Sequence, residues 1–104
     1  MTPKQREKCK QIFGHYGPMK QRRQLIEECA ELIQAITKLE RALDSGDKVK
    51  EYEAVLAIRE EIADVEIMIQ QVKGDPQTVG RNNISQIIDC KLNRQLERIK
   101  RDEE

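Results

Sequence analysis

Apolar residues recur at every third or fourth position along most of the chain, as they do on one face of an α-helix. Glycine, proline and polar residues interrupt this pattern at three places, so four helical segments are expected. They cover about residues 3–15, 19–43, 47–73 and 84–101. The pattern therefore predicts an all-α chain with the arrangement of a four-helix bundle.

The residues between these segments set the expected helix ends. Gly14 and the pair Gly17-Pro18 are expected to end the first helix. Asn83 and Gln86 have the spacing of a capping box, which predicts the start of the fourth helix. The polar residues 101–104 are expected to fray.

Composition agrees with helices packed on helices. Hydrophobic residues make up 38% of the chain, charged residues make up 37%, and only three residues are aromatic, which is unusual for a β-rich fold. Residues 1–104 are expected to form a single domain. Because so small a core leaves little apolar surface hidden, we expect the domain to assemble as an oligomer.

Features of export are absent from the sequence. The N-terminus has no apolar run followed by a small-residue cleavage site, and no stretch reaches the roughly 18 apolar residues of a membrane span. Cys9, Cys29 and Cys90 are odd in number and far apart, so we expect reduced thiols that pack as small hydrophobic side chains. We predict a cytoplasmic protein that does not bind membranes.

The two long central segments carry acids close to their apolar stripes. In residues 19–43 the expected core stripe consists of Leu25, Cys29, Leu32, Ile36, Leu39 and Leu43. Glu28 falls about 60° from the centre of that stripe, and Glu31 lies farther round on the same flank. In residues 47–73 the expected stripe consists of Ala54, Ile58, Val65, Met68, Ile69 and Val72. Glu61 lies inside this second stripe and Asp64 lies at its edge.

A carboxylate in a core-facing stripe is costly, by about several kcal/mol per ion, unless it is paired, protonated or bound to a cation. If the two segments pack antiparallel across Ser45-Gly46, Glu28 and Glu31 approach Glu61 and Asp64. The four acids are therefore candidate metal ligands. The alternative is that they are boundary glutamates and an aspartate on an ordinary helical bundle.

The kind of metal follows from the kind of ligand. A cluster of carboxylates without histidine or cysteine offers only hard oxygen atoms, which favours Mg²⁺, with Mn²⁺ as a substitute. Di-iron bundles use a Glu-x-x-His motif, and Glu31 and Asp64 stand where its histidine would be.

Charge is zero in total but uneven along the chain. Residues 1–23 hold seven basic groups and one acid, whereas residues 27–66 hold twelve acids and five bases. This asymmetry suggests a metal site beside groups that meet a polyanion. Nucleic-acid binding is not expected, because the domain is neutral overall and has few aromatic residues.

The acidic motifs resemble those of a known family. Leu25-Ile-Glu-Glu-Cys-Ala-Glu-Leu-Ile33 and Glu60-Glu-Ile-Ala-Asp-Val-Glu-Ile-Met68 are similar to the paired Glu-Glu-x-x-Glu and Glu-x-x-Asp motifs of MazG-like proteins in the all-α NTP pyrophosphatase superfamily. The resemblance extends over roughly residues 14–99 and includes His15-Tyr-Gly, Gln21 and the segment Lys91-Leu-Asn-Arg-Gln-Leu-Glu-Arg98.

The resemblance implies a Mg²⁺-dependent enzyme that hydrolyses a (deoxy)nucleoside triphosphate to monophosphate and pyrophosphate, in the service of nucleotide-pool house-cleaning. It implies assembly as a homodimer or a dimer of dimers. It also implies that Glu28, Glu31, Glu61 and Asp64 are the metal ligands. Glu27 would orient or deprotonate the attacking water.

Substrate contacts are expected from basic and amide side chains. Lys91, Arg94 and Arg98 lie at steps of three and four along one side of the fourth helix, where they could hold phosphates; the alternative is that they extend along a partly buried helix flank. Gln21 could read a base edge. Lys20, Arg22 and Arg23 form an alternative phosphate clamp.

A function of another class is also compatible with the same pattern. The apolar stripes could serve only as the seam of a non-enzymatic helical oligomerisation or interaction module.

Overall fold

Four α-helices make up the chain in the computed structural model, which describes residues 1–79 and 84–103. They are α1 (Pro3–Tyr16), α2 (Pro18–Ser45), α3 (Lys48–Lys73) and α4 (Ile84–Glu103). No strand occurs among these residues, which confirms the all-α prediction. Within the same ranges no helix has a stretch long and apolar enough to cross a membrane.

Local signals in the sequence explain where the helices begin. The Thr2 side chain caps α1 by accepting a hydrogen bond from the Gln5 backbone N–H, while Gln5 Oε1 accepts one from the Thr2 backbone N–H, which is a reciprocal capping box. Pro18 stands in the first turn of α2, where its missing N–H costs nothing. The Asp47 carboxylate accepts from the Lys50 N–H at the start of α3.

The helix ends differ from the prediction at two places. Gly14 does not end α1, which continues to Tyr16; only Gly17 ends it, since its φ of 88° is a conformation that other residues rarely adopt. The residues expected to fray at the C-terminus are helical as far as Glu103. Asn83, the expected cap of α4, lies outside the described residues.

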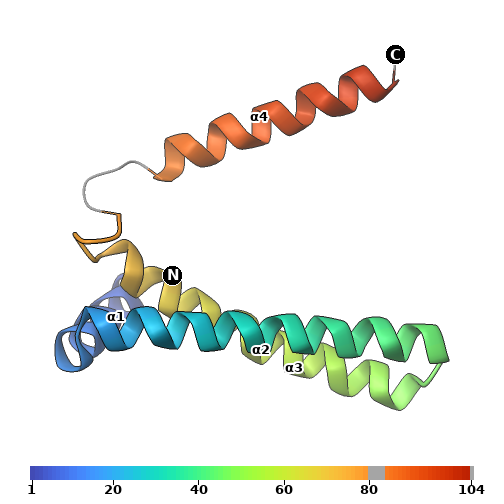
Figure 1. Cartoon of the computed structure of the whole chain (residues 1–104), viewed down its shortest axis with the longest axis horizontal. Coiled ribbons are helices and arrows are strands. Elements are labelled where there is room, and N and C mark those ends of the chain that lie inside the picture. Colours follow the sequence, from blue (N-terminus) through green and yellow to red (C-terminus); the bar gives the residue numbers. More distant parts are fainter. Residues whose placement is uncertain (80–83, 104) are drawn as a thin grey trace.

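α2 and α3 form a long antiparallel hairpin, and α1 packs on both of them at the end far from their connection (Figure 1). The connection is a tight turn at Gly46, whose φ of 72° lies in the left-handed region. Alanines are buried where the two long helices face each other: Ala35, Ala42 and Ala54. Their small side chains allow the two backbones to approach closely.

The expected stripe of α2 is displaced from the observed interface. Ile36 and Leu43 are 44% and 51% exposed, whereas Ala35 and Ala42 are buried. The face toward α3 is therefore centred about one residue earlier than predicted, on positions separated by seven residues. Glu28 belongs to this series, so it lies closer to the helix interface than its predicted position on the flank.

Two polar contacts join α2 to the end of α3. The buried Gln21 side chain donates from Nε2 to Gln71 Oε1 over 2.6 Å. Arg22 donates to a carboxylate oxygen of Asp75 over 2.9 Å, and Asp75 is only 1% exposed. A second Asp75 oxygen accepts from the Gln77 N–H. These contacts fix the chain after α3 against the first turns of α2.

α4 stands apart from this assembly. Among the described residues it contacts none of the other three helices, and Figure 1 shows it (orange to red) extending away from the hairpin. Its apolar side chains are 48–60% exposed: Ile87, Ile88, Leu92, Leu96 and Ile99. The predicted four-helix bundle is therefore not formed within one chain. In the described residues α1 packs on the α2–α3 hairpin, and α4 packs on none of these helices. Cys9 is buried as expected, but Cys90 on α4 is exposed.

The Arg22–Asp75 pair leads to a prediction about stability. Arg22→Ala leaves a buried carboxylate without its cation, and we expect it to lower the free energy of unfolding by about 1–3 kcal/mol. Arg23→Ala removes a neighbouring exposed arginine and should change stability by less than about 0.5 kcal/mol. Urea denaturation of both variants checks this. Equal stabilities would show that the ion pair does not hold the segment.

Candidate metal centre

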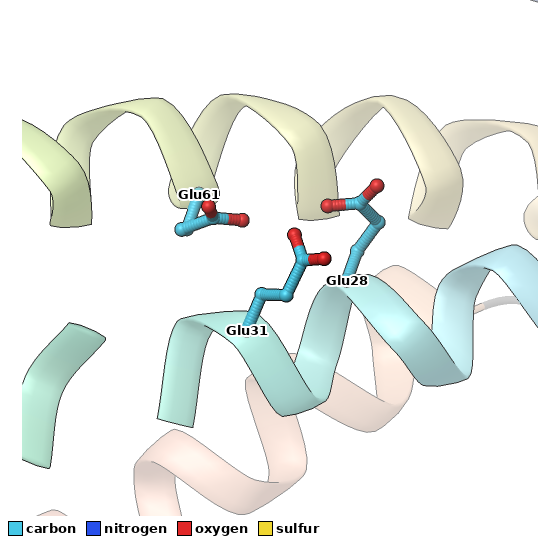
Figure 2. A group of neighbouring side chains, drawn as sticks. All are labelled: Glu28, Glu31 and Glu61. Atoms are coloured by element: carbon cyan, nitrogen blue, oxygen red, sulfur yellow. The ribbon is translucent and has the colours of Figure 1, made fainter. Parts of the chain in front are cut away.

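Three of the predicted acids converge between the two long helices. Glu28 and Glu31 extend from α2, and Glu61 extends from the facing side of α3 (Figure 2). Each offers a carboxylate oxygen, and the three oxygens lie within 4.8 Å of one another. We call these residues the acidic triad. Their convergence is what the antiparallel arrangement of the two segments predicted.

The position of each side chain follows from the hairpin. Glu28 shares its seven-residue spacing with Ala35 and Ala42, which are buried against α3. Glu31 lies one turn after Glu28 and is exposed, whereas Glu28 and Glu61 are half-buried. The triad therefore lies at the edge of the helix interface, with one side open to solvent.

Two oxygens of the triad have unmet bonding capacity. Glu28 Oε2 and Glu61 Oε2 are inaccessible to solvent, and neither has a hydrogen-bond donor among the described residues. The other Glu28 oxygen accepts from Gln24 Nε2 over 2.8 Å. Buried carboxylate oxygens normally have partners, so both oxygens need a positive or proton-donating partner, which a cation or a protonated neighbouring carboxyl would provide.

The pKa values of two acids in and beside the triad are raised, which also indicates an excess of negative charge. Burial raises the pKa of Glu61, as do the negative charge of Glu31 and a side-chain hydrogen bond with Glu31, followed by the charges of Asp64 and Glu28. Burial and then the charge of Glu28 raise the pKa of Asp64. Both shifts show that the ionised forms are unfavourable here without a compensating positive charge.

Asp64, the fourth predicted ligand, lies beside the triad. It interacts with Glu28 strongly enough to affect its own protonation, but it is not among the three residues whose oxygens meet within 4.8 Å. It is half-buried on α3, one turn after Glu61. Asp64 therefore lies at the margin of the cluster and not among its converging oxygens.

The other predicted site residues have different positions. Glu27 is exposed and lines a cavity of about 530 Å³ together with Gln21, Gln24 and Tyr16. Gln21 is largely engaged with Gln71. Gln24 connects this cavity to the triad through its bond to Glu28. The cavity thus adjoins the acids on the side toward α1.

Basic residues expected to hold phosphates are not all near the acids. Lys91, Arg94 and Arg98 are exposed on α4, and no contact brings that helix to the hairpin within the described part of one chain. Of the alternative clamp, Arg22 is engaged with Asp75, whereas Lys20 and Arg23 line the cavity that contains Glu27 and Gln24. The sequence around Asp75 gives no signal of this role, because an aspartate between Gly74 and Pro76 is typical of a loop.

Comparison with known proteins gives no assignment, since no protein family, curated protein or solved structure matches the chain. The similarity of its motifs to those of MazG-like proteins therefore stays a prediction.

The raised pKa of Glu61 predicts how stability depends on pH. A carboxyl whose pKa is raised in the folded state above its ordinary value of 4.5 binds more protons when folded, so stability falls as pH rises from about that value through the raised pKa. In EDTA, Glu61→Gln should therefore be more stable than the natural chain at pH 7, with the difference shrinking toward pH 4.

Thermal denaturation across this pH range measures the effect. Glu66→Gln, which removes an exposed acid from the same helix, serves as the control and should show no such pH-dependent difference. A Glu61→Gln variant that is less stable than the natural chain in EDTA at neutral pH would contradict the described electrostatics.

Proposed function

We propose that this chain is a Mg²⁺-dependent nucleoside triphosphate pyrophosphohydrolase that converts a (d)NTP to the monophosphate and pyrophosphate. The observation that carries the proposal is the acidic triad with its two orphaned buried oxygens, Glu28 Oε2 and Glu61 Oε2. An all-oxygen ligand set selects Mg²⁺ or Mn²⁺ over softer metals. The reaction itself is inferred from the resemblance of the acidic motifs to those of MazG-like proteins.

The ligands would come from the two long helices, whose three carboxylate oxygens lie within 4.8 Å of one another. Glu28, Glu31 and Glu61 would hold it, and Asp64 would complete the set or bind a coordinated water. When bound, the ion would neutralise phosphate charge and lower the pKa of a coordinated water. Gln24 fixes the orientation of the Glu28 carboxylate through its hydrogen bond, as outer partners of metal ligands do.

Glu27 has a position consistent with the predicted role of a base. It precedes Glu28 directly in α2 and faces the cavity that also contains Gln24 and Tyr16. A water between that cavity and the triad would lie within reach of its carboxylate. The same cavity has room for a nucleoside, and the exposed Tyr16 ring offers a surface on which a base could stack.

Turnover provides the direct test. Glu61→Gln should lower Mg²⁺-dependent pyrophosphate release by more than about a hundredfold, because it removes a charge from the metal site, while leaving helicity by circular dichroism unchanged. Glu66→Gln should retain activity. A panel of canonical and modified triphosphates with Mg²⁺ identifies the substrate; activity that survives in Glu61→Gln would refute the site.

We further propose that the functional unit is a homodimer or a dimer of dimers. A compact monomer of this mass would expose about 6,000 Å², whereas the chain exposes 8609 Å². The excess is roughly 2,600 Å² in each copy, or about 5,200 Å² for two copies, which is at the upper end of the total surface that obligate homodimers bury. A second copy covering the apolar side of α4 would remove much of it.

This assembly leads to a prediction about size in solution. The natural chain should have at least twice the 12.1 kDa mass of one copy. Introducing charge into the apolar stripe by Ile88→Asp and Leu96→Asp should shift the mass toward one copy, because each aspartate would have to be desolvated at the interface. Asn93→Asp, on the polar side of α4, should not. Light scattering after size-exclusion chromatography decides the matter, and a natural chain of single-copy mass would contradict the proposal.

A non-enzymatic oligomerisation module is the second candidate, favoured by the exposed apolar stripe of α4. Such a module needs the apolar stripe of α4 but does not need the acidic triad. It therefore predicts no Mg²⁺-dependent thermal shift, and no loss of assembly when Glu28 and Asp64 are neutralised.

A further inference from the structure

A groove lies between α2 and α3, on the part of the hairpin between the acidic triad and the Gly46 turn. Its volume is about 640 Å³, and alanines of both helices contribute to its lining. The charged side chains that line it are three cations, Lys38, Arg41 and Lys50, and one acid, Glu53. We call it the cationic groove.

The cations of this groove lack protein partners. In residues 1–79 and 84–103, ion pairs are formed by Arg22 with Asp75 and by Lys48 with Glu51, and none involves Lys38, Arg41 or Lys50. All three are exposed. Glu53 offsets only one of the three positive charges. An unpaired positive excess in a concave surface raises the local concentration of anions.

The groove continues the surface that carries the triad. Lys38 follows Glu31 by seven residues, which places it on the same side of α2 and about 10 Å farther along the helix axis. On α3, Ala57 lines the groove and stands one turn before Glu61. The same surface continues past the triad, in the direction of α1, to the cavity that contains Tyr16 and Gln24. The acids thus lie between the cationic groove, which has three cations and one acid, and a cavity that has two cations, Lys20 and Arg23, and one acid, Glu27, beside the aromatic ring of Tyr16.

We infer that the cationic groove binds the outer phosphates of the triphosphate, so that the substrate lies along the hairpin with its nucleoside toward α1. This inference rests on the proposed function. The phosphate attacked by water lies at the triad, and the leaving pyrophosphate extends toward the Gly46 turn. Arg41 can hold two oxygens with its planar guanidinium, and Lys38 and Lys50 act as point charges.

Position within one chain favours this groove over the basic residues of α4. Lys38 and Lys50 extend from the same two helices as the triad, whereas α4 contacts neither of them in the described part of the chain. The groove therefore supplies phosphate contacts without any movement of α4.

The test measures binding of inorganic tripolyphosphate by calorimetry in EDTA, and NTP turnover in Mg²⁺. The double variant Lys38→Gln/Lys50→Gln should bind tripolyphosphate about tenfold more weakly or worse, as expected for lost charge-assisted contacts. In turnover it should raise KM by a similar factor with little change in kcat. Lys48→Gln/Lys100→Gln removes the same charge outside the groove and should behave as the natural chain. The single variant Arg41→Gln removes the third cation of the groove and should also weaken tripolyphosphate binding.

The outcomes separate this inference from the proposed function. Two results would refute the groove as a phosphate site. One is equal affinity for tripolyphosphate in the two double variants, and the other is no tripolyphosphate binding by the natural chain. If the natural chain hydrolyses no triphosphate yet the groove variants alone lose tripolyphosphate binding, the proposed enzyme fails while the anion site stands. If turnover depends on Glu61 but KM is unchanged in the groove variants, the enzyme stands and the phosphate subsite fails.

Discussion

Repulsion among the carboxylates of Glu28, Glu31 and Glu61 is the interaction on which the account depends. These groups are held within 4.8 Å of one another at the edge of a helix interface, and two of their oxygens have lost water without gaining a donor. A helix pair under no other constraint would relieve this repulsion by rotating or separating. The surrounding hairpin opposes that, because the buried Ala35, Ala42 and Ala54 allow a close approach of α2 and α3 between the triad and the Gly46 turn.

The two ends of the hairpin are fixed by different means. At one end the left-handed Gly46 closes a tight turn. At the other, the Gln21–Gln71 hydrogen bond and the buried Arg22–Asp75 pair join α2 to the end of α3. The triad lies between these fixed points, so the hairpin sets the backbone positions of its three residues. Such preorganisation is what a metal site needs if binding energy is to go into the reaction. It also places the cationic groove and the cavity near Tyr16 on opposite sides of the acids, along one surface.

Much of this arrangement could be predicted from the sequence, and the exceptions have physical causes. Helix boundaries followed from Gly17, Gly46 and Asp47, and Glu61 was recognised because its position falls in an apolar stripe. The interface on α2 was predicted about one residue away from where it lies on the helix. Ile36 and Leu43 are more apolar than Ala35 and Ala42, so the hydrophobic pattern favours them. Only small residues suit helices in close contact, however, and the alanines are the ones buried. The cationic groove depends on which residues of α3 face which residues of α2. That register is a property of the pair and is not visible in either helix alone. The isolation of α4 in one chain could not be predicted either, because an amphipathic pattern shows that a face will be covered but not by what.

Manganese offers the most direct test of the central claim, because it substitutes for magnesium at oxygen sites and scatters anomalously. Crystals of the protein grown with MnCl₂ should show an anomalous peak between the carboxylates of Glu28, Glu31 and Glu61, bonded to oxygens of all three. Electron density in which these side chains diverge into solvent, with no anomalous peak between them, would contradict the account.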